Sequence, residues 1–203
     1  MSESRALLEL IQENLDDFCV ARATEFSSIS PDLMPVVEYT KDLLAGGKRF
    51  RALFAYWAWA GSLAGSDLHQ TEQQRKASAA AIVGITSALE MFHGAALVHD
   101  DLLDQSDTRR GKPAVHKKFE SLHQQSGWAG SPERFGVAGS VLVGDLMLGW
   151  SSEMFGNALL LAPSSDIETA CRTEFSKMRV EVMAGQYLDV LEENAAPTRA
   201  IHE

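Results

Sequence analysis

The sequence contains little cysteine and comparatively little positive charge, and each shortage excludes a class of protein. Its two cysteines, Cys19 and Cys171, match neither a disulfide framework nor a metal-binding motif, so we expect two reduced, buried thiols. Its 18 lysines and arginines are outnumbered by 28 aspartates and glutamates, which gives a net charge of −10. Such an acidic chain is not expected to bind nucleic acids in general or to dock on an anionic membrane.

Strand-like alternation, internal repeats and long apolar runs are also missing. The N-terminus runs into an acidic amphipathic segment and lacks the apolar region of a signal peptide. The longest uncharged stretch, residues 52–66, is shorter than the ~20 apolar residues that cross a bilayer. We therefore expect a cytoplasmic, globular protein without stable membrane insertion.

What the sequence does contain is helical periodicity along nearly its whole length. A Ser-Pro pair at residues 30–31 predicts a helix start, and Gly46-Gly47 predicts the end of that helix. Beyond an amphipathic first helix, we expect helices at about 30–45, 48–61, 71–103, 133–162 and 166–193. Polar loops are expected at 105–113 and 126–132. The sequence thus predicts one all-α domain covering residues 1–203.

An acidic motif, HDDLLD at residues 99–104, closes the long helix predicted to end near residue 103. Asp100 and Asp104 are four residues apart and therefore share one helical face. Carboxylates at the end of an apolar helix are costly unless a cation pairs with them, and Mg²⁺ typically takes one or two carboxylates with substrate phosphates. We predict Asp100 and Asp104 as Mg²⁺ ligands and Asp101, about 100° round the helix, as a weaker, bridging one. An exposed acidic helix end is the alternative.

Basic clusters lie on both sides of this motif. Arg109 and Arg110 follow it on the loop SDTRRGKP, residues 106–113, and guanidinium groups suit bidentate capture of phosphate. Upstream, GGKRFR at residues 46–51 leads a glycine pair into a helix start, whose free N–H groups favour an anion. A metal site between two anion sites suggests two diphosphate substrates. Taken alone, each cluster, including Lys117-Lys118, could equally be solvated surface charge.

In this order, the motifs resemble the first half of the trans-prenyl diphosphate synthases, Mg²⁺-dependent enzymes that build isoprenoid chains from C5 diphosphates. The resemblance rests on GGKRFR, on a histidine six residues before HDDLLD, on RRGKP and on GQYLD at residues 185–189. It implies the isoprenoid synthase fold, a bundle of long, mostly antiparallel helices, and a homodimer. The apolar segment 133–162 could supply the dimer surface, with Val137, Val141, Leu142, Leu146, Leu148 and Trp150.

The resemblance also assigns roles to individual residues. Isopentenyl diphosphate would be bound by Lys48, Arg51, His93 and Arg110. Asp100 and Asp104 would hold Mg²⁺, Arg109 would hold the allylic prenyl diphosphate, and Gln186, in the GQYLD segment, would contribute to substrate binding. The leaving diphosphate would be neutralised by Mg²⁺ and Arg109, so that no nucleophilic side chain is required.

Product length is the most specific expectation. In this family the growing chain descends from the aspartates along the same helix until a bulky side chain forms a floor. Ala95 and Ala96 are small, so Phe92 would form the floor and deepen the pocket by about 4–6 Å at 1.5 Å per residue. The added depth is comparable to one isoprene unit. A product one unit longer than farnesyl is geranylgeranyl diphosphate, which we therefore predict. Farnesyl or longer products, and Phe92 as ordinary core packing, remain the alternatives.

Two features of the family have no counterpart in the chain: a second aspartate-rich motif and the Lys-Thr pair that precedes it. We therefore expect the N-terminal part of a longer enzyme, with the C-terminal helices outside this chain and no catalysis by this part alone. Three alternatives are a non-catalytic partner subunit, an isoprenoid cyclase or head-to-head synthase, and a structural helical domain. The paired aspartates and arginines oppose the first, the Lys48/Arg51 site opposes the second, and the coincidence of four motifs opposes the third.

Overall fold

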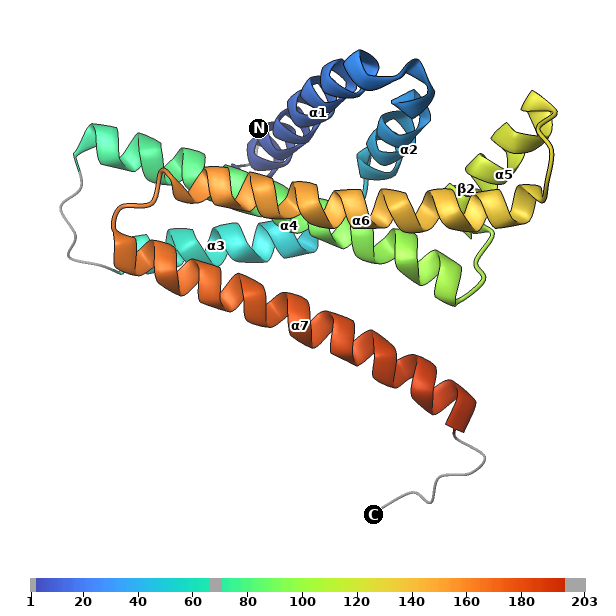
Figure 1. The fold of residues 1–203 in the computed structure, drawn as a ribbon. Helices are drawn as coiled ribbons and strands as arrows, with labels where there is room; N and C mark the ends of the chain where they lie inside the picture. The colour runs from blue at the N-terminus through green and yellow to red at the C-terminus, as the bar shows by residue number, and fades with distance from the viewer. Residues whose placement is uncertain (1–2, 66–70, 196–203) are drawn as a thin grey trace. The chain divides into compact units, whose positions relative to one another are not determined.

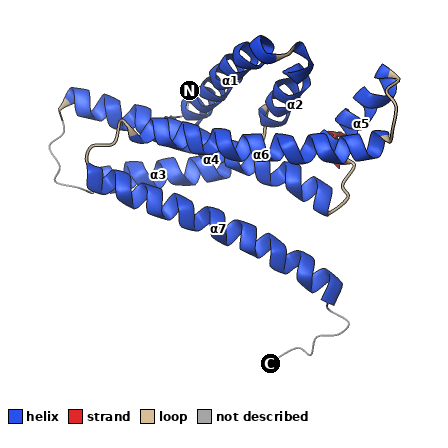
Figure 2. Cartoon of the chain, viewed as in Figure 1, coloured by secondary structure: helices blue, strands red, loops and turns tan. Residues whose placement is uncertain are grey.

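The computed structural model describes residues 3–65 and 71–195, and this part of the chain is almost entirely helical (Figures 1 and 2). The helices are α1 (Glu3–Ile29), α2 (Met34–Leu44), α3 (Phe50–Ala64), α4 (Glu72–Leu103), α5 (Val115–Ser126), α6 (Pro132–Leu159) and α7 (Ser165–Ala195). A 3₁₀ turn, Pro31–Leu33, joins α1 to α2. The predicted all-α class is confirmed. The chain divides into two compact units, Met1–Leu161 and Ala162–Glu203, and α7 is the helix of the second.

The first unit is built around α4 and α6, which pack along each other, while α1 and α3 pack against α4 and α5 packs against α6 (Figure 1). Small residues let α4 and α6 approach closely. A Cβ added to Gly84 would meet Ala158, and one added to Gly144 would overlap the His99 ring. The fully buried core includes Ile11, Leu15, Met91, Val98, Val143 and Met147.

Most helix ends lie where the sequence signals predict them. Thr71 caps α4 in a capping box with Gln74, because each side chain bonds the other residue's backbone N–H. The helix predicted to end at the glycine pair does so: α2 stops at Leu44, and Gly46 and Gly47 follow with φ of 118° and 106°. These positive values require glycine, since a Cβ disfavours that region. Helix α6 begins one residue before its predicted start and ends three residues before its predicted end.

Two elements were not predicted. Helix α5 was missed because it is short and largely polar, and it buries only Val115, Phe119 and His123. A pair of two-residue antiparallel strands, β1 (Thr108–Arg109) and β2 (Lys112–Pro113), lies inside the predicted loop 105–113. Strands this short carry no alternation that a sequence could reveal.

Helices α4 and α6 are long and apolar enough to cross a membrane by length and composition alone. Both are central helices of the first unit, with 61% and 39% of their most apolar windows buried. Core helices of globular proteins meet the same criterion, so this property is weak evidence for a membrane span.

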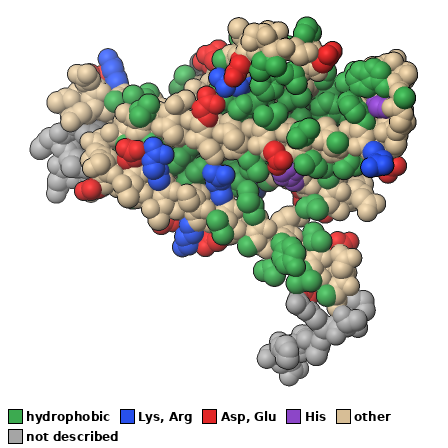
Figure 3. All heavy atoms as spheres, viewed as in Figure 1, with side chains coloured by type: hydrophobic (Ala, Val, Ile, Leu, Met, Phe, Trp, Pro, Cys, Tyr) green, Lys and Arg blue, Asp and Glu red, His purple; other side chains and the backbone are tan. Residues whose placement is uncertain are grey.

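The apolar surface of α6 differs in part from the expectation. Trp150 is wrongly assigned to a dimer surface, because it is buried against the rings of Phe18 and Phe26 at centroid distances of 6.1 and 5.7 Å. Val137, Val141 and Leu142 are exposed, as the assignment requires. Figure 3 shows hydrophobic side chains gathered beside α6, towards α1, α2 and α5.

The close approach of α6 to α4 gives a test of the fold. Gly144→Ala should destabilise the protein by about 1–3 kcal/mol, the usual effect of overpacking, since the new methyl group must displace His99. Gly149→Ala, on the same helix, is the matched control, because nothing lies within 4 Å of its added Cβ. That variant should be as stable as the wild type or more so. Urea denaturation measures both, and equal stability of the two variants would contradict this packing.

Candidate active site

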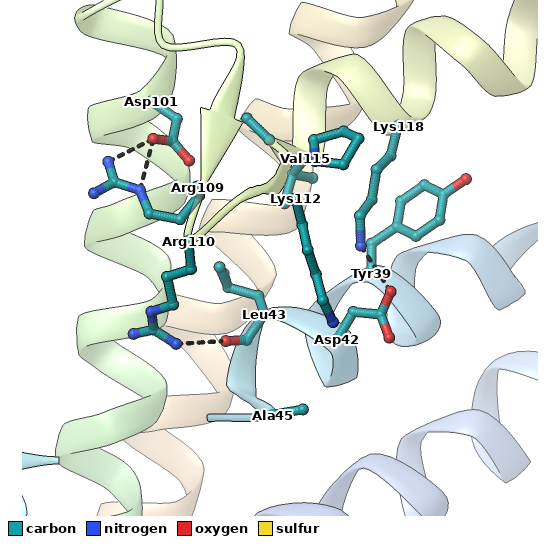
Figure 4. A pocket seen from close by; sticks show the side chains of 12 residues that line it. Tyr39, Asp42, Leu43, Ala45, Asp101, Arg109, Arg110, Lys112, Val115 and Lys118 are labelled. Carbon is teal, nitrogen blue, oxygen red and sulfur yellow. Dashed lines mark hydrogen bonds and ion pairs between the residues drawn. The ribbon is translucent and has the colours of Figure 1, made fainter. Parts of the chain in front are cut away.

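The two arginines that follow the aspartate motif are held on a tight hairpin. Strands β1 and β2 pair Thr108 with Pro113 and Arg109 with Lys112, which leaves Arg110 and Gly111 as the two turn residues. Both have positive φ, 53° and 75°, as a two-residue type I′ turn requires. The hairpin fixes neighbouring guanidinium groups that reach different partners (Figure 4).

Arg109 lies against the aspartates of α4. Its Nε donates to Asp101 Oδ1 at 2.8 Å and its Nη2 to Asp100 Oδ2 at 2.9 Å. These contacts raise the pKa of Arg109, the hydrogen bond to Asp101 having the largest effect. The arginine predicted to hold a diphosphate therefore pairs with the carboxylates predicted to hold its metal ion, so a diphosphate and these aspartates would share one guanidinium.

The solvent exposure of the three aspartates differs from what their spacing suggested. Asp101, predicted as the weaker ligand, is 1% exposed, and its backbone carbonyl accepts the Ser106 N–H at 2.8 Å. Its Oδ2 is buried and has no hydrogen-bond partner within residues 3–65 and 71–195. Asp100 is half-buried, and Asp104 is exposed at the C-terminal cap of α4. Asp101 is thus the anchor of Arg109, and Asp100 and Asp104 face outward.

This donor set fits Mg²⁺ that arrives together with a diphosphate. Over the described ranges, no group of three His, Cys, Asp or Glu side chains is arranged to hold a metal by itself. Mg²⁺ needs only one or two carboxylates when phosphate oxygens and waters complete its octahedron. Asp100 and Asp104 would supply hard oxygen ligands at the C-terminal end of α4, while Asp101 is already paired with Arg109.

Arg110 connects this cluster to the upstream glycine motif. Its Nη1 donates to the carbonyl oxygens of Gly46 and Leu43 at 3.0 and 3.3 Å. A Cβ on Gly47 would lie 2.9 Å from Arg110 Nη2, so the guanidinium lies directly over the glycine. Two basic motifs separated by more than fifty residues in the sequence thus meet at one place.

His93 joins the same place from α4. Its Nε2 lies 3.2 Å from Arg51 Nη1, and a hollow is lined by His93, Gly46 and Arg110 among others. Lys48 is exposed on the same loop, with Nζ 5.8 Å from the centre of the Phe50 ring. The structure therefore brings together Arg51, His93, Arg110 and the loop that carries Lys48.

The electrostatics of this second cluster favour an anion. Burial, followed by the positive charges of Arg51, Arg110 and Arg109, lowers the pKa of His93 from 6.5 to about 4. The ring is therefore neutral at neutral pH. Such a concentration of cationic groups in an acidic protein suits a diphosphate.

The lowered pKa of His93 has a consequence for stability. The folded state favours the neutral ring, so this stabilisation is complete above pH 6.5 and is lost as the pH falls towards 4. The wild type should lose more unfolding free energy than His93→Gln over that range. Urea titrations at both ends measure it, and a pH-independent difference between the two proteins would show that the ring is not held neutral.

A cavity of about 140 Å³ lies beside the hairpin, lined among others by Asp101, Arg109, Arg110, Lys112 and Lys118 (Figure 4). Lys118 Nζ donates to Asp42 Oδ2 at 2.7 Å and lies 5.2 Å from the centre of the Tyr39 ring. The neighbouring Lys117 pairs with Glu120. Both lysines are therefore neutralised by carboxylates, which favours the surface-charge interpretation for the Lys117-Lys118 cluster.

The residues predicted to set product length separate into two groups. Ala95 is 0% exposed and belongs to a buried stripe with Met91 and Val98, so a larger side chain there would disturb the core. Ala96 is half-buried and lies four residues before Asp100, on its side of the helix, with the buried Phe92 a further four residues back. Ala96 and Phe92 remain candidates for the chain-length floor. Ala95 packs in the core of this unit, and its part in setting product length stays a prediction.

Gln186 lies on α7, in the second unit, and its role in substrate binding stays a prediction. Two buried charged residues near the glycine motif, Arg49 and Glu90, were missed. The available signal was a glutamate one turn before His93 in an otherwise apolar segment, since a buried carboxylate needs a partner.

Comparison with known proteins identifies the family. The model of the polyprenyl synthetase family matches residues 33–202. The chain is 31% identical over 147 residues to a geranylgeranyl diphosphate synthase of Methanosarcina mazei, covering 72% of this chain and 35% of that protein. It is 32% identical over 146 residues to solanesyl diphosphate synthase 1 of Arabidopsis thaliana, covering 66% of this chain and 30% of that protein.

A solved structure agrees with these relatives. Geranylgeranyl pyrophosphate synthase of Corynebacterium glutamicum, complexed with isoprenyl diphosphate and magnesium, superposes with a TM-score of 0.82 at 30% identity. The match covers 94% of this chain and 51% of that one. The chain belongs to the polyprenyl synthetase family and has the isoprenoid synthase fold. It spans less than half the length of the curated relatives named above.

Proposed function

We propose that this chain is the N-terminal part of a cytoplasmic, Mg²⁺-dependent trans-prenyl diphosphate synthase. The enzyme condenses isopentenyl diphosphate with an allylic diphosphate. The observation that carries the proposal is the hairpin, which places Arg109 on the aspartates of α4 and Arg110 on the glycine loop beside His93. Two clusters suited to diphosphates thus lie next to each other, as a condensation of two diphosphate substrates requires.

Each cluster has a separate task. Lys48, Arg51, His93 and Arg110 hold isopentenyl diphosphate and orient its double bond. Arg109 turns from the aspartates to share its guanidinium with the allylic diphosphate, whose charge grows as its carbon–oxygen bond ionises. When bound by Asp100 and Asp104, Mg²⁺ supplies further positive charge to the leaving diphosphate. The isopentenyl double bond then forms the new carbon–carbon bond, and a proton is lost.

Geranylgeranyl diphosphate is the product that we propose. Two of the relatives described above are named as geranylgeranyl synthases, and one as a solanesyl synthase. Phe92 is a bulky, buried side chain about two turns of α4 before Asp100, with the small Ala96 between them. This arrangement supports a pocket deeper than a farnesyl chain requires.

The test is a product analysis of the complete protein. Given farnesyl diphosphate, isopentenyl diphosphate and Mg²⁺, it should form the C20 diphosphate, identified by liquid chromatography and mass spectrometry. Accumulation of C15 product from geranyl diphosphate without further growth would correct the product to farnesyl. Absence of any elongation, with the protein folded, would contradict the function.

The proposal includes a homodimer formed through α6, where Val137, Val141 and Leu142 are 45%, 41% and 61% exposed. Light scattering of the complete protein at micromolar concentration should give the mass of a dimer, and Leu142→Glu should lower it to that of a monomer. Val20→Glu, at an equally exposed apolar position of α1, is the control and should remain dimeric. A monomeric wild type would refute the dimer.

A further inference from the structure

Arg49 differs from every neighbour in the glycine motif. Lys48, Phe50 and Arg51 are exposed, but Arg49 is only 7% exposed. Its Nη2 donates to the Leu44 carbonyl at 2.8 Å and also to Gln12 Oε1. Its guanidinium therefore reaches the end of α2 and the middle of α1. It is buried beside the exposed anion cluster, by which we mean Lys48, Arg51, His93 and Arg110.

The same guanidinium faces a buried carboxylate on α4. Arg49 Nη1 lies 3.8 Å from Glu90 Oε2, and the two side chains are 5% and 8% exposed. Burial raises the pKa of Glu90, while Arg49 and then a hydrogen bond from the Ala52 backbone N–H oppose that rise. Ala52 is in the first turn of α3, where free N–H groups favour a negative charge. Glu90 thus interacts with both Arg49 and the start of α3.

The backbone at Arg49 needs such an anchor. Its φ of 47° and ψ of 38° are left-handed, a conformation that is unfavourable for a residue with a Cβ. Its carbonyl nevertheless accepts the Leu53 N–H at 3.0 Å and so begins α3. Arg49 therefore makes its buried side-chain contacts at the residue from which α3 leaves the glycine loop.

Arg49 and Glu90 both lie next to residues of the anion cluster. Arg49 lies between Lys48 and Arg51 in the chain, and Glu90 lies one turn before His93 on α4. Arg49, Glu90, His93 and Arg110 line the same hollow. Any shift of α3 relative to α4 would therefore separate Arg51 Nη1 from His93 Nε2, which are 3.2 Å apart.

We propose that Arg49 and Glu90 are a buried positioning pair for the isopentenyl diphosphate site. The pair fixes the start of α3 against α4, so that Lys48 and Arg51 converge with His93 and Arg110 on one diphosphate, and neither member contacts that ligand. The inference rests on the proposed function, because it concerns the same anion cluster. It separates the three basic residues of the motif into two that bind and one that positions them.

Affinity for inorganic diphosphate, measured by calorimetry on the complete protein without Mg²⁺, tests the pair. Arg49→Lys keeps the charge but cannot reach Leu44, Gln12 and Glu90 together. It should weaken binding by about 10- to 100-fold, the effect typical of residues that orient a binding group. Arg75→Met, which removes an exposed arginine paired with Glu72, should bind like the wild type.

A double variant, Arg49→Met with Glu90→Leu, separates positioning from stability. Removing both buried charges often leaves stability unchanged or raises it, so this variant should unfold at or above the wild-type temperature. Its affinity for diphosphate should nevertheless remain lower than that of the wild type. In the complete enzyme, Arg49→Lys should raise KM for isopentenyl diphosphate and leave KM for the allylic substrate unchanged.

The outcomes separate the two claims. Wild-type affinity in a folded Arg49→Lys variant or in the double variant would overturn the positioning role. Should the single variant unfold, the double variant alone decides. Lys48→Met and Arg51→Met must also weaken diphosphate binding. If they do not, the anion cluster itself fails, and with it the proposed function, whatever the Arg49 variants show.

Discussion

Replacing Asp100 by alanine should lower the turnover of the complete enzyme by at least about 10²–10³-fold, the range for removing one group that stabilises charge in the transition state. Asp100 is half-buried on the last turn of α4 and accepts a hydrogen bond from Arg109. Its loss removes a proposed ligand of Mg²⁺ and one of the two carboxylates that hold Arg109. The fold should persist, since Asp101 still binds Arg109 through Nε.

Asp104→Ala should have a comparable effect on turnover and an even smaller one on stability, because Asp104 is exposed. Asp32→Ala, which removes an equally exposed carboxylate from the turn between α1 and α2, is the control for loss of one negative charge. Steady-state rates at saturating Mg²⁺, with thermal melts of each variant, measure both effects. Near-normal turnover of either site variant with magnesium as the only metal would refute the metal assignment.

Phe92→Ala should shift the products of the complete enzyme to longer chains, and Ala96→Phe should shift them to shorter ones. Both residues lie on the same side of α4 as Asp100. Ala96 is four residues before Asp100, and the buried Phe92 is eight residues before it. Removing the ring deepens the pocket, while a ring at position 96 raises its floor by roughly one helical turn, about 5 Å. Mass spectrometry of the products measures the shift.

Ala95→Phe is the matched comparison, because it makes the same change one residue away. Ala95 is fully buried beside Met91 and Val98, so overpacking should cost about 1–3 kcal/mol of stability without a specific change in product length. If Ala95→Phe and Ala96→Phe shortened the products equally, the face of α4 on which a residue lies would not determine product length. Unchanged products in Phe92→Ala and Ala96→Phe together would remove this helix from the control of chain length.

The parts of the fold that could be predicted are those that depend on residues close together in the sequence. The start of α4 after Thr71 and the glycine pair after Leu44 depend on a few neighbouring residues, and both lie where expected. The hairpin could not be predicted, since its strands are two residues long and Arg110, a residue with a Cβ, takes a positive φ. What fixes that turn is contact with Leu43 and Gly46, distant in the sequence.

The site shows the same division between local and distant causes. The sequence alone places Asp100 and Asp104 on one helical face and predicts a phosphate-binding role for Arg109 and Arg110. It cannot tell that Asp101 is the most buried of the three aspartates, because that depends on how the hairpin folds back to place Arg109 over α4. Nor can it separate Arg49 from Arg51, two residues apart, although one is buried and the other is exposed.

The proposed reaction of two diphosphate substrates at adjacent clusters is tested most directly by its stoichiometry. The complete protein, given an allylic diphosphate, isopentenyl diphosphate and Mg²⁺, should release one inorganic diphosphate for each isopentenyl diphosphate consumed. The carbon chain should grow by five carbons each time, and Asp100→Ala should slow diphosphate release and chain growth to the same extent. Release of diphosphate from the allylic substrate without consumption of isopentenyl diphosphate would contradict the account, because it would show an enzyme that ionises one substrate and joins nothing to it.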